Sequence, residues 1–411
     1  MVPAAAPLPQ ALMGIEEFLH RERTRMLRIT RSFLEWLQND AAEVSPEEQQ
    51  RRFAILRLRV NDHLSQLDLF SNIVVQRSES GVGLWLSGLD VAAADALRLN
   101  DGRLGRAVPI VCYLDRGPGA AIRRARTRLP GNVLNPVAII RMPRERMVGL
   151  GIASSLFHEV GHQGAALLEL VPALRAAVDR LAASTDRDRA FAWTCWSRWM
   201  SEVVADFWAS ARLGVGATLG LIGVVNLPRA FVFRVNLNDP HPFPWIRVLL
   251  SCALGNHLYP DRQWAAVERV WRQLYPLSGV PDKVREVIDR LLPTLPTLAT
   301  LLAEFQPSPL DGTSLSAALA HPSRHPRNLR HLRDQATADP ALAARLSPAL
   351  RFALLAQARW DGTLSAAAEI REVDAMLTTW ARESTFRVAH ASAHQQQVTG
   401  RAALSREVVP T

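Results

Sequence analysis

A long apolar stretch that carries two histidines and a glutamate constrains the fold of this chain more than any other part of its sequence. Residues 146–170 are mostly apolar or small, which predicts a helix that is buried on most sides. His158, Glu159 and His162 lie in its middle. Buried imidazole and carboxylate groups need polar partners, so the fold must place a partner for them beside this helix.

The spacing of the two histidines favours a metal ion as that partner. Residues four apart lie on one face of a helix about a turn from each other, so His158 and His162 can reach the same ion. Glu159 can then lie beside the open position of the ion and accept a proton from water. Gly161 leaves room next to the expected metal. The alternative is an ordinary buried helix whose histidines are hydrogen-bonded in the core.

A second stretch offers the third ligand that a catalytic zinc ion needs. Glu202 and Asp206 are also four apart, on a helix predicted from the spacing of large apolar residues between 193 and 208. Glu202 could bind the metal, while Asp206 accepts the outer N–H of a ligating histidine and fixes its orientation. The alternative is a solvated helix face, although two solvated acids fit poorly among so many aromatic residues.

Together the two patterns resemble the gluzincin zinc metallopeptidases over about residues 135–250. The resemblance implies a zinc cofactor with three ligands, a general base and an acid behind one histidine: His158, His162 and Glu202 as ligands, Glu159 as base and Asp206 as the acid. It also implies hydrolysis of a peptide bond in a peptide or protein substrate. The alternative function is a helical binding or scaffold protein on a peptidase-like fold with a structural zinc, but such a site has no use for Glu159.

Within that group the chain looks most like the HtpX and CAAX-prenyl-protease type, in which a His-Pro stretch ending in arginine follows the ligands. Residues 239–247 and residues 321–327 both fit. His241 is the first choice to stabilise the oxyanion, because it follows the Glu202 helix closely and prolines flank it. The alternative for His241 is an exposed histidine in a surface turn, and His321 is expected to be a surface group.

The predicted fold class is α+β and mostly helical, with a zincin-like core made of a small sheet and the active-site helix, flanked by helical regions. Strands are expected at 108–114 and 135–142, and as a hairpin at 73–76 and 82–86. Prolines at both ends of the 135–142 strand suggest an edge strand, which could pair with an extended substrate. The expected regions are 1–70 (helical), 71–260 (catalytic core), 261–383 (helical) and 384–411 (a polar, partly mobile tail).

Two helices are predicted in the N-terminal region. The first spans residues 12–37, and the second runs from Ser45 to about residue 69. Ser45 is the expected cap of the second helix, and Glu48 is expected to close a capping box with it.

Composition limits the partners and the location of the protein. The net charge is +9, but the arginines are spread along the chain and mixed with acids, so no nucleic-acid partner is expected. Three widely spaced cysteines and the absence of a signal peptide indicate a reducing, cytoplasmic location.

Residues 213–227 are apolar, but fifteen residues fall short of the roughly 20 that span a bilayer. A buried helix or loop is expected there, unlike in the membrane-bound relatives.

Overall fold

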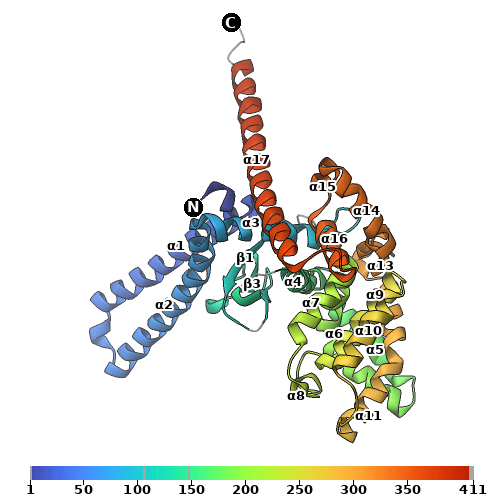
Figure 1. Cartoon of the computed structure of the whole chain (residues 1–411). Helices are drawn as coiled ribbons and strands as arrows, with labels where there is room; N and C mark the ends of the chain where they lie inside the picture. Colours follow the sequence, from blue (N-terminus) through green and yellow to red (C-terminus); the bar gives the residue numbers. More distant parts are fainter. Residues whose placement is uncertain (1, 105–107, 118, 147–148, 407–411) are drawn as a thin grey trace.

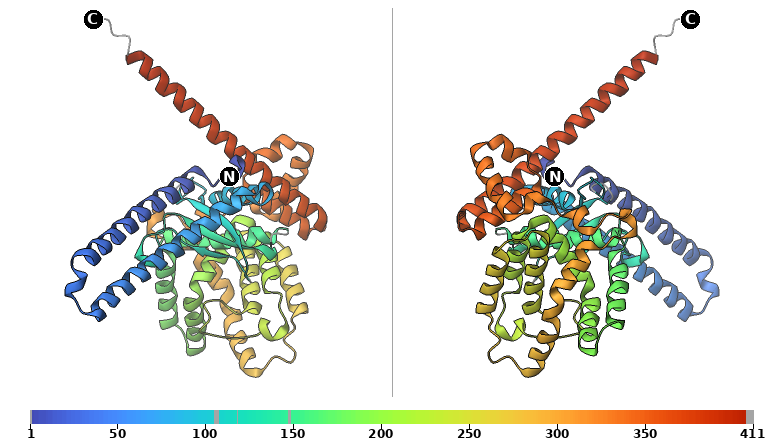
Figure 2. Two further views of the ribbon diagram at one scale, coloured as in Figure 1. Left: turned by 90° about the vertical axis from the view of Figure 1, so that its left-hand side faces the viewer. Right: turned by 90° about the vertical axis from the view of Figure 1, so that its right-hand side faces the viewer.

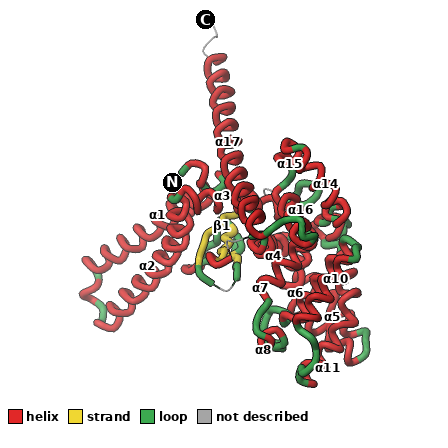
Figure 3. The backbone as a smooth tube through the Cα atoms, in the orientation of Figure 1, coloured by secondary structure: helices red, strands yellow, loops and turns green. Residues whose placement is uncertain are grey.

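The computed structural model describes residues 2–104, 108–117, 119–146 and 149–406. Within them the fold is α+β and mostly helical, with one three-stranded sheet (Figures 1 and 3). A helical hairpin projects from one side of the body, and a long C-terminal helix projects from another (Figure 2). The coarse fold class predicted from the sequence is therefore confirmed.

The projecting hairpin consists of α1 (Pro9–Asn39) and α2 (Pro46–Val75), which confirms both predicted helices. At its base, Phe18 packs against Phe70 with ring centroids 5.1 Å apart. The Ser45 hydroxyl accepts the backbone N–H of Glu48, as predicted for the cap of α2. The Glu48 carboxylate instead binds the two arginines that follow it, so only the Ser45 half of the expected capping box forms.

The predicted strand hairpin at 73–76 and 82–86 is wrong. Residues 73–75 are the last turn of α2, and residues 82–86 belong to α3 (Ser80–Leu97). The buried residues of α3 recur at helical rather than alternating spacing, with Leu86, Leu89 and Ala93 on the core side. The polar residues between the two segments begin a helix instead of turning a hairpin.

The sheet contains β1 (Ile110–Asp115), β2 (Ala121–Arg123) and β3 (Ala138–Pro143) in the order β1-β3-β2. β3 runs parallel to β1 and antiparallel to β2. The prediction that the 135–142 strand is an edge is wrong, because β3 lies in the centre. Pro136 precedes the strand and Pro143 is its last residue, so neither removes a hydrogen bond from the middle of the ladder.

Both faces of the sheet are covered. Ile140 in β3 packs into the main core with α3 and α4, whereas its neighbour Ile139 packs against the base of the α1–α2 hairpin. This alternation follows from the two-residue period of a strand. The sheet therefore joins the hairpin to the body.

The helix that carries His158 and His162 is α4 (Gly151–Leu167), and it is followed by α5 (Leu170–Ala183), α6 (Arg187–Leu213) and α7 (Val215–Val225). α4 is shorter than the predicted 146–170 helix. Gly149 precedes it with φ 79°, and Glu169 separates it from α5 with φ 53°. Met147, an apolar residue of the predicted helix, lies outside the described residues. α7 is a mostly buried helix at the apolar 213–227 segment, and no helix in the described residues is long and apolar enough to cross a membrane.

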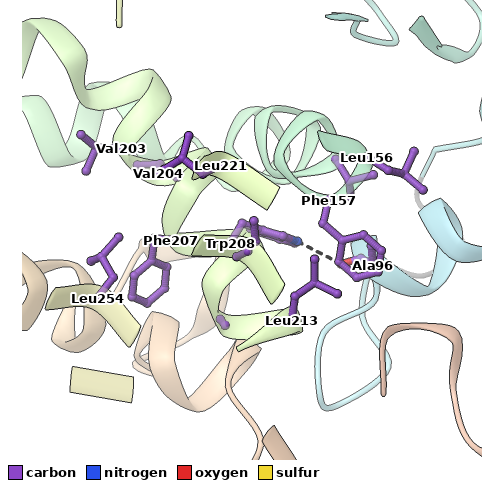
Figure 4. Close-up of a cluster of buried hydrophobic side chains, with 14 of the residues drawn as sticks. Ala96, Leu156, Phe157, Val203, Val204, Phe207, Trp208, Leu213, Leu221 and Leu254 are labelled. Atoms are coloured by element: carbon purple, nitrogen blue, oxygen red, sulfur yellow. Dashed lines mark hydrogen bonds between the residues drawn. The ribbon is translucent and has the colours of Figure 1, made fainter. Parts of the chain in front are cut away.

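α4 and α6 pack closely because glycines of α4 face α6. A Cβ atom on Gly161 would lie 2.9 Å from Ala205 Cα and 2.9 Å from Trp208 Cβ. A Cβ atom on Gly164 would overlap the ring of Trp208. The Trp208 indole occupies the core around this contact and donates a hydrogen bond to the Ala96 carbonyl (Figure 4). Gly161 therefore serves the approach of the two helices, rather than leaving space for a metal as the sequence suggested.

The remaining helices complete the body, and most of them contribute to one main core that extends from Leu86 to Trp380. Pro326–Ala338 packs through a smaller separate cluster, and Pro340–Arg345 has no buried residue. They are α8 (Arg229–Val232), α9 (Pro244–Leu258), α10 (Gln263–Leu274), α11 (Asp282–Leu291), α12 (Leu295–Glu304), α13 (Leu315–Leu319), α14 (Pro326–Ala338), α15 (Pro340–Arg345), α16 (Pro348–Trp360) and α17 (Ala366–Arg406). Most of the helices after residue 260 thus share a core with the region predicted to be catalytic. The region boundaries themselves stay predictions.

α17 crosses α3 closely and also holds the start of α4. A Cβ atom on Gly88 of α3 would overlap the backbone of Leu377 in α17. At the other contact, the Glu369 carboxylate accepts the backbone N–H of Leu150, at 2.6 Å. The helix continues to Arg406, past the predicted start of the tail at residue 384, and residues 407–411 lie outside the described residues.

Candidate metal centre

The predicted ligands come together where α4 crosses α6. His158 and His162 lie one turn apart on α4, and the side chain of Glu202 on α6 lies between them. Nε2 of His158 lies 3.2 Å from Oε2 of Glu202, and Nε2 of His162 lies 3.4 Å from Oε1 of the same carboxylate. One donor atom from each of the three residues falls within 4.8 Å of the others.

Asp206 lies behind His158, on the side away from Glu202. Its Oδ1 is 2.9 Å from Nδ1 of His158. The contact has the distance of an ion pair but not the direction of a full hydrogen bond, so Nδ1 is a buried nitrogen without a hydrogen-bond partner among the described residues. Asp206 therefore occupies the position that the sequence predicted for it.

Arg247 on α9 joins the two acids. Its guanidinium donates to both oxygens of Asp206, at 2.7 and 2.9 Å, and lies 3.4 Å from Oε2 of Glu202. The side chains of Arg247, Glu202 and Asp206 are all at least nine-tenths buried. Pro244 stands in the first turn of α9, where its fixed φ suits a helix start, and Arg247 follows one turn later.

The charges around the two histidines separate their pKa values. Burial lowers the pKa of His158, but the carboxylates of Asp206 and Glu202 outweigh it and raise the pKa to about 9. Burial and the neighbouring His158 lower the pKa of His162 to about 4. Burial raises the pKa of Glu202, but His158 and Arg247 outweigh it and lower the pKa to about 2. Near pH 7, His162 is thus neutral and Glu202 ionised, the forms that bind metals, whereas His158 is protonated and must lose a proton to bind one.

Glu159 follows His158 on α4, and its side chain faces the same candidate site. It is buried, and burial raises the pKa of its carboxyl group. It lines a cavity of about 150 Å³ together with His158, Glu202 and His241. A carboxylate with a raised pKa beside a cavity suits proton transfer near neutral pH.

Part of the lining of this cavity is apolar. α7 supplies Ala217, Leu221 and Val224, and α6 supplies Ala209. The apolar segment 213–227, which is too short to span a bilayer, therefore forms part of the lining of the cavity.

Of the two His-Pro segments, the first reaches the site. Nε2 of His241 lies 3.3 Å from Oε2 of Glu202, and its Nδ1 lies 2.8 Å from Oδ1 of Asp239. Its side chain is 52% exposed, so it closes the site on the solvent side. His321 lies elsewhere, where its ring bonds Ser323 at the start of a short 3₁₀ turn. Both placements agree with the sequence-based preference for His241.

Two features of the site were not assigned from the sequence. In the sequence, Arg247 was recognised only as the arginine that ends the first His-Pro segment. Two buried acids on one helix would require a buried arginine beside them. β2, three residues long, was not expected at all. It is the edge strand beside β3 in the described sheet, and the cavity reaches Gly119 and Ala120 just before it. An edge strand therefore adjoins the cavity, but it is β2 instead of β3.

Comparison of the chain with known protein families, with curated proteins and with solved structures found no match.

Proposed function

We propose that the protein is a zinc-dependent metallopeptidase that hydrolyses a peptide bond at the cavity beside His158, His162 and Glu202. The observation that carries this proposal is the set of three donors from two helices, with Glu159 facing the same cavity. Two imidazole nitrogens and a carboxylate oxygen are a donor set typical of catalytic zinc.

The distances from the Glu202 carboxylate to the two histidines are of the size that a zinc ion requires. Two donors bound tetrahedrally at about 2.1 Å from one ion lie about 3.4 Å from each other. The Glu202 carboxylate lies 3.2 Å from His158 Nε2 and 3.4 Å from His162 Nε2. Asp206 behind His158 fits the second partner that ligating histidines usually have.

Each residue then has a distinct task. Bound zinc would supply Lewis acidity, which makes water a nucleophile near neutral pH. Glu159 accepts the proton from the attacking water and delivers it to the leaving amine. His241, oriented by Asp239, donates a hydrogen bond to the oxyanion. Arg247 holds Glu202 and Asp206 in place.

The surroundings of the donors favour catalysis over a structural zinc. A structural site is closed by four protein ligands, whereas three protein donors meet here beside a cavity. A general base has no task in a structural site. The exposed edge of β2 next to the cavity supports an extended peptide as substrate, because such an edge offers unpaired backbone groups.

The size and lining of the cavity favour an uncharged side chain of modest size next to the scissile bond. Its volume is about 150 Å³, and Ala209, Ala217 and Leu221 line it. A charged side chain would lose its hydration against these apolar residues, and two charged groups of the lining, Asp206 and Arg247, already pair with each other.

Metal analysis and peptide digestion test the proposal together. Purified protein should carry about one zinc per chain, and the zinc should be lost in the His158→Ala and His162→Ala variants. A peptide library should be cleaved by the zinc-loaded protein and not after chelation. A folded protein that binds no zinc, or zinc-loaded protein that leaves the whole library intact, would overturn the proposal.

A further inference from the structure

The outer part of the α1–α2 hairpin leaves an apolar groove open between its two helices. Figures 1 and 2 show the hairpin projecting from the body, with no other described element beside its outer half. The floor of the groove is formed by Ile29, Phe33 and Trp36 of α1 and by Ile55 and Leu56 of α2. Two helices alone cannot cover such a floor, so these side chains are half-buried or exposed.

The rim of the groove is basic. Arg28, Arg52 and Arg59 line it, and no carboxylate does. Arg52 stacks on Trp36 and is partly neutralised by Glu48. Neither Arg28 nor Arg59 forms an ion pair within the described part of the chain. The groove therefore presents aromatic and aliphatic side chains between free positive charges.

The groove continues towards the base of the hairpin, where it meets a buried polar atom without a partner. A second hollow shares Ile29 and Arg59 with the first, is also lined by Glu22, Arg25 and Asp62, and reaches Gln66. The Gln66 amide nitrogen donates to the carbonyl of Pro130, but its Oε1 is buried and has no partner among the described residues. Such an acceptor is costly unless something supplies a donor.

We propose that this groove binds an amphipathic helix with an acidic face from another protein, completing a three-helix bundle. From Glu22 to Trp36 the groove follows α1 for about 21 Å at 1.5 Å per residue, which matches roughly four turns of a partner helix. Apolar side chains of that helix fill the floor at helical spacing. Its carboxylates pair with Arg28 and Arg59, and a donor near one end reaches Gln66.

The charges at the hairpin tip favour a protein helix over an anionic membrane. Asp40, Glu43, Glu47 and Glu48 gather where α1 turns into α2. These acids would meet the lipid headgroups first and be repelled by them. The apolar residues also line a concave groove, which a helix fills and a flat bilayer surface does not.

Two synthetic peptides test the proposal on the full-length protein. Both are labelled 18-residue helices with leucine at the a and d heptad positions, and they carry either glutamate or lysine at the flanking e and g positions. Fluorescence anisotropy should show that the glutamate peptide binds at least tenfold more tightly than the lysine peptide. The doubly substituted variant Arg28→Glu/Arg59→Glu should lose at least tenfold in affinity for the glutamate peptide and gain affinity for the lysine peptide.

A matched variant controls for net charge. Arg31→Glu/Arg57→Glu makes the same charge change on the same two helices, but neither residue lines the groove. It should bind the glutamate peptide within about threefold of the unchanged protein. Circular dichroism of both variants establishes that the hairpin still folds.

Any one of five outcomes would overturn the proposal. Equal affinity for the two peptides, or no binding of either, would remove the acidic helix as occupant. An equal loss in the control variant would show that net charge acts without the groove. Co-sedimentation with vesicles of phosphatidylglycerol that depends on Arg28 and Arg59 would assign the surface to a membrane. A dimer in sedimentation velocity that the Arg28→Glu/Arg59→Glu variant dissociates would assign it to a second copy of the chain.

Discussion

Arg247 holds Asp206 by two parallel hydrogen bonds in the protein interior, from Nε to Oδ2 at 2.7 Å and from Nη2 to Oδ1 at 2.9 Å. Asp206 in turn lies 2.9 Å from the His158 ring, so a buried cation on α9 orients an imidazole on α4. Burial raises the pKa of Asp206, but Arg247 and His158 outweigh it and lower the pKa below its usual range. The stabilisation from the Arg247–Asp206 pair is thus fully present above the ordinary pKa of an aspartate. It is lost only as the pH falls through the lowered pKa of Asp206.

Replacing Arg247 by methionine should destabilise the protein strongly. Asp206 and Glu202 would stay buried without their cation, and breaking one side of a buried pair typically costs about 3–5 kcal/mol. Urea denaturation of zinc-free protein measures this loss. Arg189→Met, which breaks an exposed pair, should leave the free energy of unfolding nearly unchanged. Equal stability of the two variants would mean that the Arg247 pair contributes nothing.

Replacing Glu159 by glutamine separates chemistry from binding. The amide keeps the shape of the side chain but has almost no proton affinity, so zinc should stay bound and the fold intact. Peptide hydrolysis should fall by at least about a hundredfold, the low end for loss of a general base. Turnover measured on the zinc-loaded variant checks this, and an unchanged rate would remove Glu159 from the mechanism.

The two acids on α6 should differ in their effect on zinc. Glu202→Ala removes a ligand and should abolish most of the zinc occupancy when metal is limiting. Asp206→Ala removes only the group behind His158, so zinc affinity should weaken by roughly 10- to 100-fold and excess zinc should restore occupancy. Competition against a chromophoric chelator measures both. The opposite ranking would exchange the roles of the two acids.

His241 and His321 should differ in their effect on turnover. His241→Ala should lower kcat with little change in KM or zinc content, because the lost hydrogen bond acts in the transition state. Such a loss typically amounts to about 2.7–4 kcal/mol. His321→Ala serves as the control and should be nearly silent, since its ring bonds Ser323 away from the site. Normal kcat in the His241→Ala variant would remove that residue from catalysis.

Two glycine substitutions test the crossing of α4 and α6. Alanine normally stabilises a helix by about 1 kcal/mol relative to glycine. At Gly161 its Cβ would lie 2.9 Å from Ala205 and Trp208, and overpacking typically costs about 1–3 kcal/mol, so Gly161→Ala should destabilise the protein and weaken zinc binding. Gly223 in α7 has no atom within 4 Å of the added Cβ, so Gly223→Ala should be neutral or stabilising. The thermal unfolding and the zinc affinity of both variants test whether the crossing of α4 and α6 requires glycine at position 161.

The side chains that gather at the candidate site could be predicted, because their spacing along the sequence is local information. The i, i+4 spacing of His158 with His162, and of Glu202 with Asp206, fixes which side chains share a helical face. Their meeting needs only that the two helices cross, and the structure brings them together. The partner of the acids is different, because Arg247 is recognisable only once α9 is packed against α6.

The strands predicted at 108–114 and 135–142 are confirmed as β1 and β3, but the third strand and the order of the sheet could not be predicted. Residues 73–76 and 82–86 are apolar runs too short to distinguish strand from helix, and tertiary packing on the sheet and on α17 made them helical. The place of β3 depends on β2, a three-residue strand with no pattern of its own. Proline at strand ends is equally compatible with an edge and with a central strand that stops there.

The core that runs from Leu86 to Trp380 also sets an order for biosynthesis. The histidines at 158 and 162 leave the ribosome long before α17, whose Glu369 anchors the start of their helix. At a synthesis rate of about 5–20 residues per second, they wait roughly 10 to 40 s for their last packing partner. A nascent chain thus carries the proposed metal ligands on an unfinished core, and the completed candidate site is a property of the nearly finished protein.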